Sequence, residues 1–94
     1  MIANIKPEFY NAIRKGEKTI EYRKTKILFS AFYNTITFKN IKTNEKFTAD
    51  IEKIEILKVD KIDIQKMTVK EVNFLAEYYK NEEWGVLIYL GKIN

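Results

Sequence analysis

The spacing of apolar residues changes along the chain between the two-residue period of a strand and the three-to-four-residue period of a helix. Residues 2–6, 19–23, 32–39, 47–57 and 84–90 carry alternating or continuous apolar segments, which predict strands. Residues 7–15 and 68–80 carry helical spacing. The predicted order is strand, helix, three strands, helix and strand, which is typical of an α+β fold with a small sheet that curls on itself.

Local signals mark the ends of both predicted helices. Pro7 suits the first turn of a helix, and Gly16 follows the apolar stripe of residues 9–13 as a C-terminal cap with a positive φ. Thr68 and Glu71 have the spacing of a capping box, which predicts the start of the second helix. Residues 16–23 are therefore predicted to form a turn and a strand.

The predicted strand 19–23 alternates between polar and apolar residues. Thr19, Glu21 and Arg23 fall on one face. Ile20 and Tyr22 fall on the other. We therefore expect the polar face to point toward water and the apolar face to point toward the core.

Two later strands carry further signals. The alternation in residues 47–57 breaks between Ile51 and Ile54, which predicts a β-bulge of the kind that bends a curved sheet. Residues 84–90 form a nearly continuous apolar run, which is typical of a central strand covered on both faces. Most aromatic residues are expected in the core, Tyr22 and Phe32 among them, and Tyr10, Tyr33 and Trp84 are the candidates for exceptions.

Length and composition exclude several classes of function. The 94 residues suit one domain spanning the whole chain, 1–94. The chain has no cysteine and no histidine, which argues against a disulfide framework, a thiolate nucleophile and a metal site. No cofactor is predicted. No apolar run is long enough for a membrane span, so we expect a cytoplasmic protein.

The formal charge of +4 is distributed unevenly. Residues 1–40 hold eight Lys or Arg and three Glu, for a charge of +5, and residues 41–94 hold nine Lys and ten acids, for −1. A basic N-terminal half is compatible with phosphate binding. The abundance of Lys, Ile and Asn also arises from AT-rich coding, which says nothing about partners.

Gly16, Lys18, Glu21 and Arg23 match the Gly-x-Lys-x-x-Glu-x-Arg pattern of the ASCH family position for position. The strand-to-helix entry at residues 5–7 also resembles that family. The resemblance as a whole is strong over residues 2–24 and weak over the rest of the chain. The resemblance implies a small PUA-like β-barrel of about five strands with two flanking helices. It also implies a cleft, lined by the motif, for RNA or a nucleoside-like ligand.

Within that resemblance, the charged residues have distinct roles. Lys18 is a mobile point charge, Arg23 can contact a phosphate or a base edge in a bidentate manner, and Glu21 can orient Arg23 or accept from a base amino group. The set expected to bind nucleic acid comprises Lys6, Lys18, Glu21, Arg23, Lys24 and Tyr33. The plainer alternative is an exposed strand face with an ion pair that contributes little to stability.

A second hypothesis is a small amidohydrolase. Some short ASCH proteins hydrolyse N4-acetylcytidine with a lysine, a hydroxyl residue and a glutamate, and Lys18 matches the lysine. The chain departs from that pattern because Glu21 stands where the hydroxyl residue is expected, and the expected acid falls near Gln65. Glu21 as a base, a displaced hydroxyl from Thr19, and Glu71 as the acid are the remaining catalytic candidates.

A third hypothesis is a protein-binding inhibitor or regulator carried by a mobile element. Its support is the small size of the chain and a second, acidic surface in the C-terminal half. That surface would comprise Asp60, Asp63, Glu77, Glu82 and Glu83. An ordinary solvated face explains the same residues.

Overall fold

The computed structural model describes residues 2–24 and 34–94. Its elements are β1 (Ile2–Ile5), α1 (Pro7–Arg14), β2 (Ile20–Lys24), β3 (Thr35–Asn40), β4 (Lys46–Lys58), a 3-10 turn η2 (Val59–Lys61), α2 (Val69–Tyr78) and β5 (Trp84–Ile93). The order of elements and their types agree with the sequence prediction. Within this part of the chain, no helix is both long enough and apolar enough to cross a membrane.

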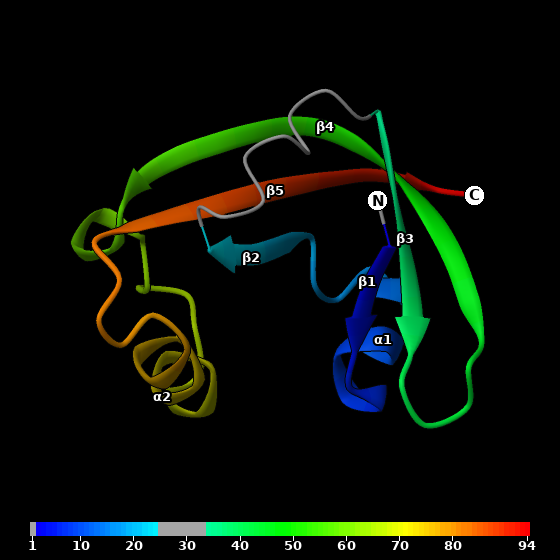
Figure 1. The fold of residues 1–94 in the computed structure, drawn as a ribbon, viewed down its shortest axis with the longest axis horizontal. Coiled ribbons are helices and arrows are strands. Elements are labelled where there is room, and N and C mark those ends of the chain that lie inside the picture. Colours follow the sequence, from blue (N-terminus) through cyan, green and yellow to red (C-terminus); the bar gives the residue numbers. More distant parts are fainter. Residues whose placement is uncertain (1, 25–33) are drawn as a thin grey trace.

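The five strands form one curled sheet, which makes a half-barrel with the two helices below it (Figure 1). The strand order is β1-β3-β4-β5-β2, with β1 and β3 parallel and the other pairs antiparallel. This is the predicted α+β architecture of a small PUA-like barrel. The strand β2, which carries the charged motif, lies at one edge of the sheet and pairs with β5.

The predicted bulge is present in β4. The pairing of β4 with β5 shifts register between Ala49 and Ile51 and again between Ile51 and Lys53. Extra residues on one strand bend it and increase its twist. The long strand β4 can therefore arch over the whole molecule (Figure 1).

Two separate apolar clusters fill the interior. The first contains residues of β1, α1, β3 and β4 together with Val86 and Ile88 of β5. The second contains Leu87 of β5 with Ile62, Leu75 and Tyr79 from the region of α2. Because alternate residues of a strand point to opposite faces, β5 contributes to one cluster with each face. The continuous apolar run of β5 thus serves both clusters, as predicted for a strand covered on both sides.

The predicted helix signals are also present. Pro7 occupies the first turn of α1, and Thr68 forms a complete capping box with Glu71 at the start of α2. Gly16 ends the first helical region with a φ of +78°, and its backbone N–H donates to the carbonyl of Ile13. Both helices end slightly earlier than predicted, at Arg14 and Tyr78.

The aromatic predictions had mixed outcomes. Trp84, one of the candidate exceptions, is 41% exposed. Tyr10, another candidate, is only 2% exposed and belongs to the core. Its ring packs edge-on against Phe47, and its hydroxyl accepts a hydrogen bond from Arg14, so the polar end can be buried at little cost. Phe32 and Tyr33 lie outside the described residues.

The conformation of Gly16 leads to a prediction. A Cβ at this position would meet no neighbouring atom, so the cost of Gly16→Ala comes from the positive φ alone. We expect Gly16→Ala to lower the free energy of unfolding by about 1 kcal/mol in urea denaturation. Gly16→Asn should cost less, because asparagine tolerates this conformation better. Equal losses in the two variants would contradict this explanation.

Candidate functional site

A tight turn places the charged motif beside the end of α1. The backbone N–H groups of Glu17 and Lys18 both donate to the carbonyl of Ala12, at 2.9 and 3.1 Å. Just before β2 begins, the carbonyl of Thr19 accepts from the N–H of Leu90. The side chain of Lys18 is therefore held over the start of the edge strand.

Lys18 and Arg23 both form ion pairs with Glu21, so the three side chains make one network. Lys18 Nζ lies 2.9 Å from Glu21 Oε1, and Arg23 Nη2 lies 2.7 Å from Glu21 Oε2. Each carboxylate oxygen thus accepts from a different cation. We call these three residues the charged triad.

Glu21 is buried, which corrects the expectation that its side chain points toward water. It is 7% exposed, although it lies on the polar face of an edge strand. A buried carboxylate is tolerated when its charge is paired and its oxygens are hydrogen-bonded. The two flanking cations satisfy both conditions. The alternation of residues along the strand cannot show that these cations cover the carboxylate, which is why the sequence did not predict its burial.

The environment of Glu21 also sets its protonation. Burial alone would raise the pKa of this carboxyl, but the charges and hydrogen bonds of Lys18 and Arg23 outweigh burial, so the net pKa lies below its ordinary value. Glu21 is therefore ionised at neutral pH. Both of its oxygens are engaged by the triad.

The two cations keep further donor capacity. Lys18 Nζ also donates to the carbonyl of Ile20 at 2.7 Å, and it lies near the rings of Phe9 and Tyr22. The Nε of Arg23 is buried and has no hydrogen-bond partner among the described residues. The triad therefore offers mainly hydrogen-bond donors, because each oxygen of its carboxylate already accepts from one cation.

A cleft of about 1210 Å³ runs along β2 between the two helices. Its lining includes four consecutive residues of β2, from Ile20 to Arg23, so the cleft reaches both faces of this edge strand. Aromatic residues contribute much of the wall: Phe9, Tyr22, Phe74, Tyr78 and Tyr89. Small-molecule sites typically combine apolar walls with a few polar groups.

The charges of the lining are balanced. The cations among the described lining residues are Lys6, Lys18, Arg23, Lys61, Lys66 and Lys70. The acids among them are Glu8, Glu17, Glu21, Glu55, Asp63 and Glu71. The described lining therefore contains six positive and six negative side chains. Although the N-terminal half of the sequence is positively charged, the described wall of the cleft is not basic.

The structure brings most of the predicted site residues together. Lys6, Lys18, Thr19, Glu21, Arg23 and Glu71 all line the cleft. Lys24 does not belong to this lining; its Nζ lies over the ring of Tyr78 instead. Tyr33 lies outside the described residues. The Oε1 of Glu71 accepts from the backbone and hydroxyl of Thr68, so its side chain serves the capping box.

Sequence reasoning missed the aromatic side chains that α2 contributes to the cleft. The helical spacing of residues 68–80 indicated an apolar stripe of Val72, Leu75, Ala76 and Tyr79. Phe74 and Tyr78 also line the cleft and stack, with their ring centroids 6.0 Å apart. Their spacing of four places them on one face, distinct from the face of Leu75 and Tyr79. A second aromatic stripe on a short helix was the signal that could have identified them.

Within residues 2–24 and 34–94, no group of three or more potential metal-ligating side chains comes together.

The buried carboxylate leads to a prediction about pH. Because the pKa of Glu21 is lowered in the folded state, this carboxylate stabilises the fold at pH values above 4.5, the ordinary pKa of a glutamate. The contribution is lost as the pH falls through the pKa of Glu21 in the folded state. Glu21→Gln should therefore lose less stability than the wild type when urea denaturation is followed from pH 5 down to about 3. At neutral pH the same change should cost about 1.5–3 kcal/mol.

The exposed Glu17 provides a matched control in the same turn. Glu17→Gln should retain the acid sensitivity of the wild type. The burial argument fails if Glu21→Gln and Glu17→Gln have the same pH profile.

Comparisons with known proteins support the fold. No protein-family model and no curated protein matched the sequence. Among solved structures, a serine-to-alanine mutant of the Zymomonas mobilis ASCH protein gives a TM-score of 0.79 at 20% identity, covering 97% of this chain and 66% of that one. A tyrosine-to-phenylalanine mutant gives 0.73 at 18%, covering 97% and 68%.

The ASCH protein from Zymomonas mobilis gives a TM-score of 0.71 at 17% identity, with coverage of 97% and 66%. The present chain therefore spans about two thirds of the length of the proteins it resembles. The likeness covers nearly the whole described fold, including the sheet and both helices. The chain has the fold of an ASCH domain, as the motif at residues 16–23 predicted.

Proposed function

We propose that the cleft binds a nucleoside-like ligand through the charged triad. The observation that carries this proposal is the position of the triad in the wall of an aromatic cleft, where Lys18 and Arg23 are held by a buried carboxylate. Such a carboxylate fixes the two donors before the ligand arrives. Fixed donors lose less conformational entropy on binding than free surface side chains do.

The chemistry of the cleft suits a flat heterocycle. The rings of Phe9 and Tyr22 line the cleft and offer surfaces for stacking, which is how unpaired bases are commonly held. The triad offers donors, so the complementary ligand edge carries acceptors. Cytosine and guanine both present adjacent acceptors, from O2 and N3 in the first case and from O6 and N7 in the second.

The balanced charge of the lining favours a nucleoside over a long RNA. Proteins that bind the nucleic-acid backbone neutralise phosphates with clusters of lysine and arginine. Here the six cations of the described lining are matched by six acids. A ligand with little or no charge fits that environment better than a polyanion. RNA binding remains the alternative that a salt titration can distinguish.

The geometry supports binding more than amide hydrolysis. Lys18 Nζ donates to both Glu21 and the carbonyl of Ile20, so two of its donor positions are already engaged within the chain. Glu21 uses both oxygens within the triad, and Glu71 is engaged with Thr68. We therefore propose that the chain binds N4-acetylcytidine or a related nucleoside without turning it over. The protein-partner hypothesis and a cytoplasmic location stay predictions from the sequence.

The proposal can be tested by calorimetric titration of the purified chain with nucleosides, N4-acetylcytidine and short RNAs. We expect a nucleoside to bind with an affinity that changes less than about twofold between about 50 and 200 mM salt, because few phosphates are neutralised. An RNA-binding protein with many phosphate contacts would lose orders of magnitude of affinity over the same range.

Arg23→Lys is the informative variant, because it keeps the charge beside Glu21 but removes the planar fork of the guanidinium. We expect it to fold and to bind the nucleoside about tenfold more weakly. Lys24→Gln removes a neighbouring cation outside the cleft lining and should bind like the wild type. Binding of no nucleoside by the folded protein would refute the proposal, and release of acetate from N4-acetylcytidine would favour the hydrolase hypothesis.

A further inference from the structure

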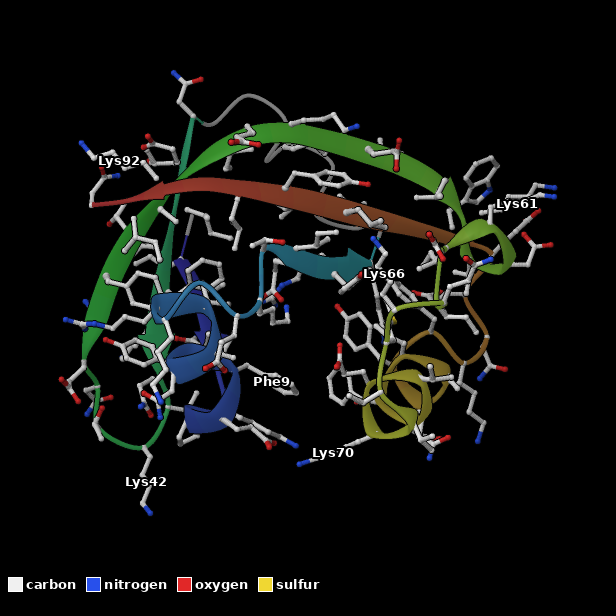
Figure 2. All side chains as sticks on the ribbon, turned by 180° about the vertical axis from the view of Figure 1, so that it is seen from behind. Phe9, Lys42, Lys61, Lys66, Lys70 and Lys92 are labelled. Atoms are coloured by element: carbon white, nitrogen blue, oxygen red, sulfur yellow. The ribbon has the colours of Figure 1, made fainter. Side chains whose placement is uncertain are left out.

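Two side-chain contacts bridge α1 and α2 across the cleft. The rings of Phe9 and Phe74 lie 5.0 Å apart with an angle of 53° between their planes. Beside them, Lys70 Nζ lies 3.1 Å from Glu8 Oε2. Figure 2 shows Phe9 pointing from α1 toward α2, and Lys70 pointing from α2 toward α1.

All four residues line the cleft, and the two helices have separate cores. Phe9 packs against the first apolar cluster, which contains Tyr10 and Ile13 of α1. The second cluster contains Leu75 of α2. The contact between Phe9 and Phe74 therefore joins a residue packed on the first cluster to the helix that carries Leu75 of the second cluster. Phe74 belongs to neither cluster.

We propose that Phe9 and Phe74 form an aromatic gate that controls entry to the cleft and limits the size of the ligand. This inference rests on the proposed nucleoside site and concerns how the ligand enters it. A single flat ligand can pass when the two rings move apart. A longer or bulkier ligand requires the helices themselves to separate.

The aromatic contact, rather than the ion pair, holds the gate closed. Aromatic pairs contribute beyond the area they bury, whereas exposed ion pairs contribute little and are screened by salt. Lys70 is largely exposed, and Glu8 is more than half exposed. Phe74 itself is 41% exposed, so its ring lies at the surface of the cleft and has room to move.

The absence of cysteine from the sequence allows a direct test of access. Leu87 is buried and lines the cleft, so a Leu87→Cys thiol reports how often reagents reach the interior. We would measure its reaction rate with N-ethylmaleimide and with the bulkier fluorescein maleimide, before and after adding Phe9→Ala or Phe74→Ala. Lys92→Cys, on an exposed position outside the cleft lining, calibrates the reagents.

We expect either phenylalanine variant to accelerate labelling of the Leu87→Cys thiol about two- to tenfold, with the larger increase for the bulkier reagent. Lys70→Gln should change the rate less than twofold. Val69→Ala truncates an exposed side chain of the same helix outside the cleft and should leave the rate unchanged. Ile20→Cys, which is half-buried and also lines the cleft, replaces the probe if Leu87→Cys does not fold.

Unchanged labelling in both phenylalanine variants would overturn the gate, as would an equal acceleration by Val69→Ala, which would indicate general loosening of α2. These rates need no ligand, so they can support the gate even if no nucleoside binds. Where a nucleoside does bind, its association rate should rise in Phe9→Ala and Phe74→Ala, and an unchanged association rate would also count against the gate.

Discussion

The buried carboxylate of Glu21 is the constraint on which the site depends. It lies on an edge strand, where a charged side chain normally reaches water, yet it is enclosed between Lys18 and Arg23. Removing either cation leaves a buried charge without full compensation, which is costly. The carboxylate therefore fixes the turn after α1, the orientation of Arg23 on β2 and the wall of the cleft. Lys18 also donates to the carbonyl of Ile20, so its side chain connects the turn after α1 to the start of β2.

The cleft is a consequence of how one strand serves two cores. The alternate residues of β5 enter different apolar clusters, so α1 and α2 pack around separate centres. A sheet covered in this way leaves its edge strand between the two helices. Residues on both faces of β2 then line the same cleft, which explains why the apolar Tyr22 and the charged Glu21 share it. The hydroxyl of Tyr79 donates to the carbonyl of Arg23 and ties this edge to the second core.

Backbone features set by a few neighbouring residues were predictable from the sequence, whereas the burial of individual side chains was not. The capping box of Thr68, the positive φ of Gly16 and the bulge after Ile51 follow from local patterns, so those patterns were sufficient. The burial of Glu21 and Tyr10 depends on cations and rings contributed by other positions. Strand alternation places a side chain on a face, but it cannot state what covers that face.

The same distinction applies to charge. The N-terminal half of the sequence carries +5, which favours an anionic partner when charge is counted along the chain. Folding changes the relevant unit from the segment to the surface, and the described cleft lining combines cations and acids from both halves in equal number. The site is therefore distinguished by the ionisation and hydrogen bonding of its side chains more than by its net charge. An ionised Glu21 with both oxygens engaged leaves Lys18 and Arg23 as donors, so in the function proposed above the cleft selects a ligand by the pattern of its acceptors more than by its total charge.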